Sequence, residues 1–217
     1  MHKGLLFDLD GVIVDTAKYH FIAWKEIAKE LGIPFTEKDN ERLKGVSRNR
    51  SFEIILEIGK QYMPEEEQEL YCTRKNDIYL SYIMAMKQDE ILPGVESFLK
   101  DVKQKGYRIA LGSASKNSAL ILERLQLTDL FDALIDGTKV SKAKPDPEVF
   151  LEGAKALGLQ PEECIVFEDA VAGIEAAHAG GMQAVGIGSK ELLPDADMNI
   201  PGLECITIEQ IEKLLHK

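Results

Sequence analysis

The chain has 217 residues, of which 45% are hydrophobic, and its formal net charge is −11 at neutral pH. This length indicates one or two domains, and the apolar content is ample for a packed core, which excludes a disordered chain. The acidic balance argues against nucleic acid and anionic membranes as partners, because both need clustered cations.

No targeting signal is evident. No apolar stretch approaches the length of a membrane span, and acids occur by residue 8, so we expect neither a membrane anchor nor a signal peptide. The three cysteines, Cys72, Cys164 and Cys205, are far apart and lack metal-ligand spacing. Thiols in a reducing compartment are the simplest interpretation, which predicts a cytoplasmic protein.

An apolar run from Gly4 to Phe7 opens the chain and is followed by Asp8 and Asp10. Such a run predicts a buried parallel strand, which is apolar on both faces. Two carboxylates cannot be buried unpaired, so we expect them in the crevice at the strand's carboxyl end, where open α/β sheets bind ligands. Gly11 then permits a sharp turn.

The next part of the chain reads as helical. Helical patterns cover residues 17–31, 37–43, 48–62 and 64–87, and no strand signal occurs between Ile33 and Leu92. We therefore predict an all-helical domain over residues 16–89, inserted into a core made of residues 1–15 and 90–217. Thr16, His20 and Trp24 recur every four residues, so they share one face of the first helix.

From Leu92 onward, strand and helix patterns alternate. Strands are expected at 107–112, 133–135, 164–167, 182–187 and 198–200, and helices at 95–105, 116–125, 147–157, 170–179 and 207–215. Alternation of this kind predicts an α/β fold with a Rossmann-like, doubly wound parallel sheet.

Polar residues follow the core strands. Ser113 to Asn117 follow one strand at a predicted helix start, which is a ready anion site, although Ser113 or Ser115 can equally be an ordinary helix cap. Lys144 precedes a proline and is held extended. Glu168 and Asp169 form a second acid pair, and two acid pairs in one crevice call for a cation, with Mg²⁺ the natural candidate.

These sites resemble, in order, the motifs of the haloacid-dehalogenase-like phosphotransferases. The first is the D-x-D-G run at Asp8, followed by Ser113, Lys144 and the pair Glu168-Asp169. The resemblance implies that Asp8 is a phosphoryl-accepting nucleophile and Asp10 a general acid/base. It implies one Mg²⁺ held by Asp8, the Asp10 carbonyl and Asp169, with Glu168 as a further ligand or partner. Ala170 departs from the pattern, since relatives often carry Ser there.

The helical insertion resembles the cap domain of one family in this superfamily, the β-phosphoglucomutases. The resemblance lies in Thr16 to His20 with Trp24, in Leu43 to Arg48, in Arg74 to Asp77 and in the core segment Ser113 to Asn117. It implies that Thr16 and His20 assist catalysis with Lys144. The substrate-binding residues it implies are Trp24, Lys44, Gly45, Val46, Ser47, Arg48, Lys75, Ser113, Ala114, Ser115, Lys116 and Asn117.

The resemblance implies an isomerase that interconverts β-D-glucose 1-phosphate and β-D-glucose 6-phosphate. The reaction would pass through β-D-glucose 1,6-bisphosphate and an aspartyl-phosphate, in a monomer whose cap closes over the substrate to exclude water. The alternative on the same fold is a sugar-phosphate phosphatase. A catalytically silent relative is disfavoured by the intact motif residues. Whether the Lys144–Pro145 bond is cis is open from the sequence.

Overall fold

The computed structural model describes residues 3–43, 47–204 and 206–215, and side chains as far as residue 213. Three predicted substrate-binding residues, Lys44, Gly45 and Val46, therefore lie outside the described residues, as does Cys205. The chain divides into two compact units. One, the core unit, comprises Met1–Asp15 and Met86–Lys217, and the other, the helical unit, comprises Thr16–Ala85.

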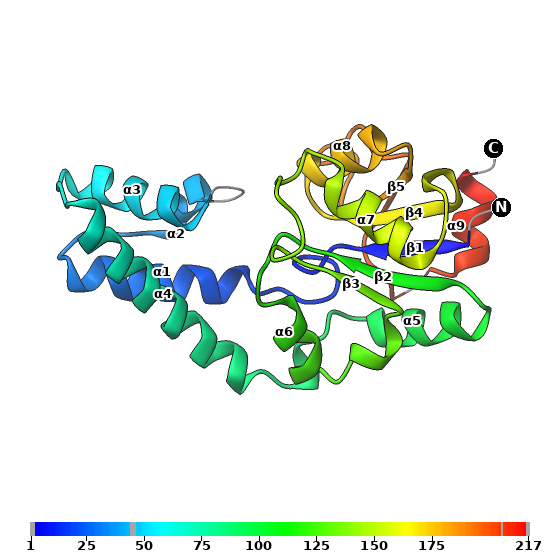
Figure 1. Cartoon of the computed structure of the whole chain (residues 1–217), viewed down its shortest axis with the longest axis horizontal. Helices are drawn as coiled ribbons and strands as arrows, with labels where there is room; N and C mark the ends of the chain where they lie inside the picture. Colours follow the sequence, from blue (N-terminus) through cyan, green and yellow to red (C-terminus); the bar gives the residue numbers. More distant parts are fainter. Residues whose placement is uncertain (1–2, 44–46, 205, 216–217) are drawn as a thin grey trace. The chain divides into compact units, whose positions relative to one another are not determined.

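The core unit is built on a parallel sheet of six strands with the order β3-β2-β1-β4-β5-β6 (Figure 1). This is the doubly wound strand order of the Rossmann fold, so the predicted fold class is confirmed. The strands are β1 (Gly4–Phe7), β2 (Arg108–Gly112), β3 (Ala133–Ile135), β4 (Cys164–Glu168), β5 (Gln183–Ile187) and β6 (Met198–Ile200).

Helices cover both faces of this sheet. They are α5 (Val95–Gln104), α6 (Ser118–Arg124), α7 (Glu148–Leu157), α8 (Val171–Ala179) and α9 (Ile208–Leu215), with short 3-10 turns at Gln88–Glu90, Thr128–Leu130 and Pro161–Glu163. Leu6 and Val166 pack into a buried cluster with α7 and α8. Their neighbours Phe7 and Phe167 stack at 4.5 Å between ring centroids and meet Phe98 of α5. Alternate residues of a strand point to opposite faces, so α5 lies across the sheet from α7 and α8.

The order of the strands also locates the site. Chain connections run outward from β1 to one side and from β4 to the other, which makes the gap between β1 and β4 the point where the winding reverses. In open α/β sheets the crevice at the carboxyl ends of these two strands binds ligands. Phe7 pairs with Phe167 in the ladder, so Asp8 and Glu168 leave the sheet side by side.

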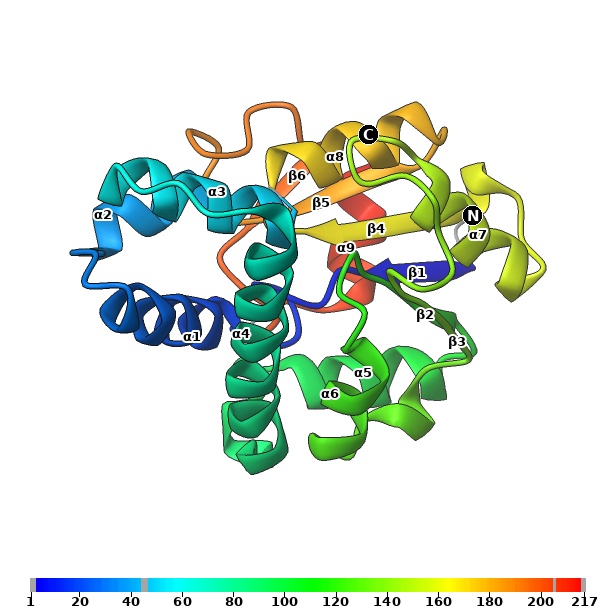
Figure 2. The ribbon, with the colours of Figure 1, turned by 60° about the vertical axis from the view of Figure 1, so that its left-hand side comes forward.

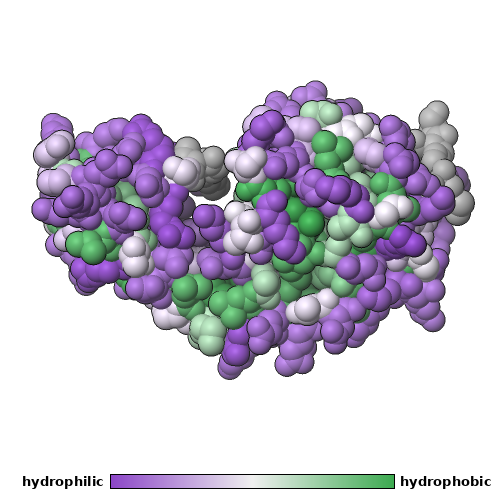
Figure 3. Space-filling model, in the orientation of Figure 1, coloured by the Kyte–Doolittle hydropathy of each residue, from purple (hydrophilic) through white to green (hydrophobic). Residues whose placement is uncertain are grey.

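The helical unit contains α1 (Ala17–Glu30), α2 (Glu37–Asn40), a 3-10 turn at Glu41–Leu43, α3 (Arg48–Gly59) and α4 (Glu65–Ala85). Helices α1 and α4 pack against each other and cross in the view of Figure 2. Trp24 of α1 stacks on Phe52 of α3, which stacks in turn on Tyr71 of α4. This aromatic row is the centre of the unit's own buried core, while the face of the unit seen in Figure 3 is mainly hydrophilic.

Several predicted boundaries were wrong. Helix α3 ends at Gly59 and not at residue 62, because Lys60 adopts the left-handed conformation that terminates helices. The helical unit ends at Ala85, four residues before the predicted limit at 89. Among the described residues, no helix has the length and apolar character needed to cross a bilayer.

Candidate active site

Asp8 and Glu168 stand at the carboxyl ends of the two strands that flank the reversal of winding. Asp8 immediately follows β1 and its amide donates to the Phe167 carbonyl at 3.0 Å. Glu168 is the last residue of β4. Both side chains are buried, and an ionised carboxylate that is buried requires a partner of opposite charge.

Lys144 supplies that partner. Its ammonium donates to Asp8 Oδ1 and to Glu168 Oε1, the latter at 2.5 Å. It also lies 4.7 Å from the ring centroid of Phe150, within the range of a cation–π contact. Burial alone would lower the pKa of Lys144, but the charges of Asp8 and Glu168 outweigh it and raise that pKa above its ordinary value. Lys144 is therefore a permanently charged group in the crevice.

Glu168 is held by Lys144 on one side and by the protein backbone on the other. Its Oε2 accepts the amide N–H of Ala170 at 2.9 Å. Residue 170 thus donates a hydrogen bond to the carboxylate from its main chain, although it has no side-chain hydroxyl. Its carboxyl group lies against Gly173 of α8, where a Cβ would come within 1.9 Å of it. Burial, with a further contribution from the charge of Asp8, raises the pKa of Glu168 to about 7.

Asp169 approaches the same centre from the turn after β4. Its carboxylate lies against Gly11, whose φ of +76° and lack of a side chain permit the contact, since a Cβ there would fall 1.9 Å from Oδ2. The residue as a whole is exposed, but its carboxyl group is partly enclosed. This partial burial, followed by the charge of Asp8, raises the pKa of Asp169 to about 6.

The donor set of this crevice fits a divalent cation that prefers oxygen ligands. Lys144 brings one positive charge to a crevice where Asp8, Glu168 and Asp169 bring three carboxyl groups. Among the described residues, no group of three or more carboxylate, imidazole or thiol side chains is arranged to hold a metal ion unaided. Mg²⁺ usually takes one or two carboxylates and completes its shell with water and phosphate oxygens, so the carboxylates of Asp8 and Asp169 are protein ligands of the kind it uses.

Asp10 sits in the turn that follows β1. Gly11 N–H donates to the Val14 carbonyl at 2.8 Å, and Asp10 and Val14 form an isolated bridge. These contacts fix the backbone of the turn at Asp10, which is two residues after Asp8 in the chain. Val14 also bridges to Ile91, which ties this turn to the segment where the chain re-enters the core unit.

The segment Ser113 to Asn117 is not the helix start that we predicted. The Ser113 hydroxyl accepts the Ser115 amide at 3.1 Å, and the Ser115 hydroxyl accepts the Asn117 amide at 3.2 Å. Serine hydroxyls that bond the amide two residues on form turns and compete with helix. Helix α6 therefore begins only at Ser118, and neither serine is its N-cap, which is Asn117. Ser113 is buried, while Ala114 and Lys116 are exposed.

In the helical unit, His20 and Lys75 form a polar pair in which Lys75 is buried and His20 is partly buried. Lys75 Nζ lies 2.6 Å from His20 Nδ1. A charged ammonium can only donate, so with Lys75 charged the His20 ring carries its proton on Nε2. Burial, then the charges of Lys75 and Arg48, lower the pKa of His20 to about 3. Burial, then the charge of Arg48, lowers the pKa of Lys75 to about 7.

Aromatic rings enclose this pair. Tyr79 stacks on His20 with 4.2 Å between ring centroids, and its hydroxyl donates to Thr16 Oγ1 at 3.3 Å. Lys75 Nζ lies 5.2 Å from the Trp24 ring centroid and 5.0 Å from that of Tyr79. Thr16, His20 and Trp24 thus share the face of α1 that meets α4, as their spacing predicts.

Arg48 is the first residue of α3, and Ser47 is its N-cap, whose side chain accepts the Arg50 amide at 3.2 Å. The Arg48 guanidinium donates from Nη2 to Asn76 Oδ1 at 2.8 Å. The side chain is exposed, so Asn76 orients a cation that remains accessible to a ligand. The helical unit therefore brings together Thr16, His20, Trp24 and Lys75 around Tyr79, with Arg48 fixed by the neighbouring Asn76.

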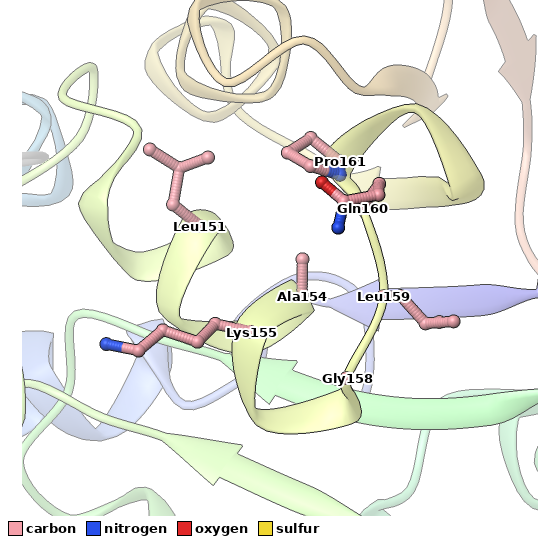
Figure 4. Close-up of a pocket in the computed structure, with 7 residues that line it drawn as sticks. All are labelled: Leu151, Ala154, Lys155, Gly158, Leu159, Gln160 and Pro161. Carbon is pink, nitrogen blue, oxygen red and sulfur yellow. The ribbon is translucent and has the colours of Figure 1, made fainter.

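A hollow of about 450 Å³ on the core unit is lined by the end of α7 and the loop after it (Figure 4). It lies near the start of β4, whereas Asp8 and Glu168 lie at the other ends of the strands. Lys155 is the one charged residue of its lining, and that ammonium is engaged by Glu152. The lining of this hollow therefore has no cluster of charged groups like that of the crevice, and we do not consider it a candidate active site.

Comparison with known proteins identifies the fold family. Residues 2–181 match the family described as haloacid dehalogenase-like hydrolase. The chain belongs to this family. It is 44% identical over 218 residues to β-phosphoglucomutase of Bacillus subtilis, covering 99% of this chain and 94% of that protein. The crystal structure of β-phosphoglucomutase from Clostridium difficile matches with a TM-score of 0.90 and 42% identity, covering 100% and 98% of the two chains.

Phosphatases of the same family are also similar to the chain. The phosphorylated carbohydrates phosphatase of Thermotoga maritima is 30% identical over 187 residues, covering 84% of this chain and 83% of that protein. The two β-phosphoglucomutases match at higher identity and greater coverage, which confirms the resemblance predicted from the sequence motifs.

Within this family framework, sequence reasoning missed residues that support the predicted ones. Tyr79 and Gly173 were not singled out, although each touches a predicted site residue. Tyr79 lies one helical turn after Lys75, a spacing that places both on one face of α4. Gly173 carries no such signal, because the need for a missing Cβ depends on how closely α8 approaches Glu168.

Proposed function

We propose that the chain interconverts β-D-glucose 1-phosphate and β-D-glucose 6-phosphate through β-D-glucose 1,6-bisphosphate and a phosphorylated aspartate. The observation that carries this proposal is the identity of 44% to a β-phosphoglucomutase over 99% of the chain. Such an identity extends over both the core unit and the helical unit, and the helical unit contains most of the residues expected to bind the substrate. The charged crevice around Lys144 gives the proposal its chemistry.

In the proposed first step, an Asp8 carboxylate oxygen attacks the phosphorus of the bisphosphate in line. The bond from phosphorus to the sugar oxygen breaks, and Asp10 donates a proton to that oxygen, leaving an aspartyl-phosphate and a sugar monophosphate. In the return step Asp10 removes the proton from the hydroxyl of the other monophosphate, and that oxygen takes the phosphoryl group from Asp8. Asp10 is thereby restored after each cycle.

Lys144 and Ser113 are assigned to the transferring phosphoryl group. Lys144 is held charged beside Asp8 by Glu168, so its positive charge is already in place where charge develops during transfer. Asp8, the Asp10 carbonyl and Asp169 would hold Mg²⁺, with Glu168 as a further ligand or a partner. When bound, the ion would neutralise phosphoryl oxygens in the transition state.

Residues of the helical unit are assigned to the sugar phosphate. Arg48 would bind the non-reacting phosphate bidentately, a geometry that a guanidinium forms better than an ammonium. Lys116 and Asn117 would contact the same phosphate. Trp24, Ser47 and Lys75 would contact the sugar, together with the loop residues Lys44, Gly45 and Val46. His20 and Thr16 would help to position Asp10, and Ala114 and Ser115 would present the backbone beside Ser113.

We further propose that the protein acts as a monomer in the cytoplasm. The described cysteines Cys72 and Cys164 are both buried free thiols, which is compatible with a reducing compartment.

A product assay tests the function. The protein is incubated with β-D-glucose 1-phosphate and a trace of β-D-glucose 1,6-bisphosphate, with and without Mg²⁺, and Asp8→Asn serves as the inactive control. We expect glucose 6-phosphate to accumulate with Mg²⁺ present and to be absent with Asp8→Asn. Release of inorganic phosphate in place of glucose 6-phosphate would identify a sugar-phosphate phosphatase instead.

A further inference from the structure

We propose that Glu148 is a positioning residue for Lys144: its carboxylate fixes the loop that brings the Lys144 ammonium to Asp8. The inference concerns phosphoryl transfer in this crevice and rests on the proposed function only for the role of Lys144 there.

The loop between β3 and α7 carries Lys144 and is long enough to need anchoring. It runs from Asp136 to Pro147, and most of the residues from Thr138 to Ala143 are exposed. Its first part is held by Asp136, whose Oδ1 accepts the Thr138 amide at 2.9 Å and the Thr138 hydroxyl at 2.5 Å. A second anchor is required closer to Lys144, because side-chain position follows backbone position.

Glu148 provides that second anchor. Its Oε2 accepts the amide of Ser141 at 3.0 Å and the amide of Lys142 at 2.7 Å. The Ser141 hydroxyl donates to both carboxylate oxygens at 3.1 Å. These hydrogen bonds lower the pKa of Glu148, the one from Lys142 most strongly. Backbone donors to a carboxylate are among the stronger hydrogen bonds in proteins.

The anchor is rigid because Glu148 is the first residue of α7. The two residues after it, Val149 and Phe150, are buried in the core against the sheet. Glu148 therefore fixes the backbone of Ser141 and Lys142 relative to α7. One residue, Ala143, separates Lys142 from Lys144, and Ala143 is itself tied by the Asp146 amide, which donates to its carbonyl at 3.0 Å.

Lys144 is thus held from two sides. Its backbone is flanked by the Glu148 anchor and by the turn at Asp146, while its ammonium meets Asp8, Glu168 and the ring of Phe150. Loss of the Glu148 carboxylate would leave two amides and one hydroxyl of the loop without their acceptor. The loop would relax, and the Lys144 ammonium would leave the position that serves phosphoryl transfer.

A double-mutant cycle tests the assignment. Phosphoenzyme formation from acetyl phosphate is followed by intact mass in single turnover for the wild type, Glu148→Ala, Lys144→Ala and the double variant. We expect Glu148→Ala to slow phosphorylation by about 10- to 100-fold when Lys144 is present, the scale of a misplaced catalytic group. In the Lys144→Ala background, we expect Glu148→Ala to lower the rate of phosphorylation by less than about twofold. An equal loss in both backgrounds, or no loss with Lys144 present, would overturn the proposal.

A matched control and a second readout keep the test decisive. Glu152→Gln removes the same charge one turn later on α7, where the carboxylate meets the exposed Lys155, and should leave the rate within about twofold. Glu148→Gln, which retains one acceptor oxygen, should recover part of the rate and replaces Glu148→Ala if that variant does not fold.

The second readout is the acetylation of Lys144 by a lysine reagent, measured by peptide mass. The extent of acetylation should rise in both Glu148 variants and not in Glu152→Gln. Acetylation of Lys144 that is the same in the Glu148 variants as in the wild type would contradict the proposal. Because acetyl phosphate and acetylation involve no sugar, a failure of the proposed mutase activity would leave this test intact.

Discussion

Each unit of the protein contains a lysine that is largely shielded from solvent, and the two lysines have opposite electrostatic surroundings. Lys144 in the core unit is bound to Asp8 and Glu168, and their charges raise its pKa. Lys75 in the helical unit lies among His20, Trp24 and Tyr79, and burial lowers its pKa to about 7. Among the residues that the structure describes, no carboxylate lies within ion-pair distance of Lys75.

This difference shows how partners decide what a buried ammonium can do. The charges of Asp8 and Glu168 favour the charged form of Lys144, as phosphoryl transfer requires. Lys75 is destabilised in its charged form, so an oxygen-rich ligand that restores hydrogen bonds to it would be favoured. The two lysines are therefore suited to two tasks, transition-state stabilisation in the core unit and ligand recognition in the helical unit.

Removal of Lys144 is expected to have the largest effect. Lys144→Ala should slow phosphoenzyme formation by about 10³-fold, since a preorganised charge on the phosphoryl group is lost. The rate with acetyl phosphate, measured by intact mass, checks this. Lys155→Met on α7, where Lys155 is exposed and paired with Glu152, should remain within about twofold of the wild type. If Lys144→Ala formed the phosphoenzyme as fast as the wild type, Lys144 would not stabilise the transition state, and the contrast drawn with Lys75 would be wrong.

Arg48→Ala should separate recognition from chemistry. We expect isomerisation of the sugar phosphate to fall by about 10²-fold, because a bidentate phosphate contact is lost. Hydrolysis of acetyl phosphate should stay within about threefold, because that substrate has no second phosphate. Arg50→Ala is the control, since Arg50 is committed to Glu53 and Glu57 on the surface of α3. Equal losses in both reactions would contradict the assignment of Arg48.

Lys75 should make the stability of the helical unit depend on pH. Its folded pKa of about 7 lies below the ordinary 10.5, so between these values the unfolded chain binds more protons. Stability should therefore rise with pH across this window, by up to about 1.4 kcal/mol per pH unit. The destabilisation is fully present below about pH 7 and absent above about 10.5.

Urea unfolding followed by Trp24 fluorescence measures this stability, because Trp24 is the single tryptophan of the chain and belongs to the helical unit. Lys75→Met should abolish the slope and Lys38→Met, an exposed control, should retain it. A slope that survives in Lys75→Met would show that Lys75 is not the titrating group.

Asn76→Ala should produce the smallest effect. Asn76 orients the Arg48 guanidinium through one hydrogen bond of 2.8 Å, so its loss should raise the KM for sugar phosphate about fivefold with little change in kcat. Steady-state kinetics of isomerisation checks this, with Asn49→Ala on the exposed side of α3 as control. A fall in kcat alone would place Asn76 in the chemistry and not in recognition.

The sequence was sufficient for the fold and for the charged residues of the crevice. Asp8 directly follows β1 and Glu168 ends β4, and the parallel sheet brings such positions to one edge regardless of loop detail. Lys144 lies in the loop between β3 and α7, and its place before a proline in the family motif, not its distance from a strand, indicated it. The sequence was insufficient at Ser113 to Asn117, because serine is compatible both with a helix cap and with a turn, and local hydrogen bonds from the Ser115 and Asn117 amides to serine hydroxyls select the turn. It also could not locate Glu148 or Tyr79, whose importance depends on contacts between segments.

We propose above all that the core unit transfers a phosphoryl group and that the protein delivers it to sugar phosphate in preference to water. The most direct test loads Asp8 with labelled phosphate from acetyl phosphate, adds β-D-glucose 1-phosphate and measures where the label goes. We predict that the label appears in the bisphosphate and then in glucose 6-phosphate. Release of the label as inorganic phosphate, at a rate that the sugar phosphate does not alter, would show that the protein is not a mutase.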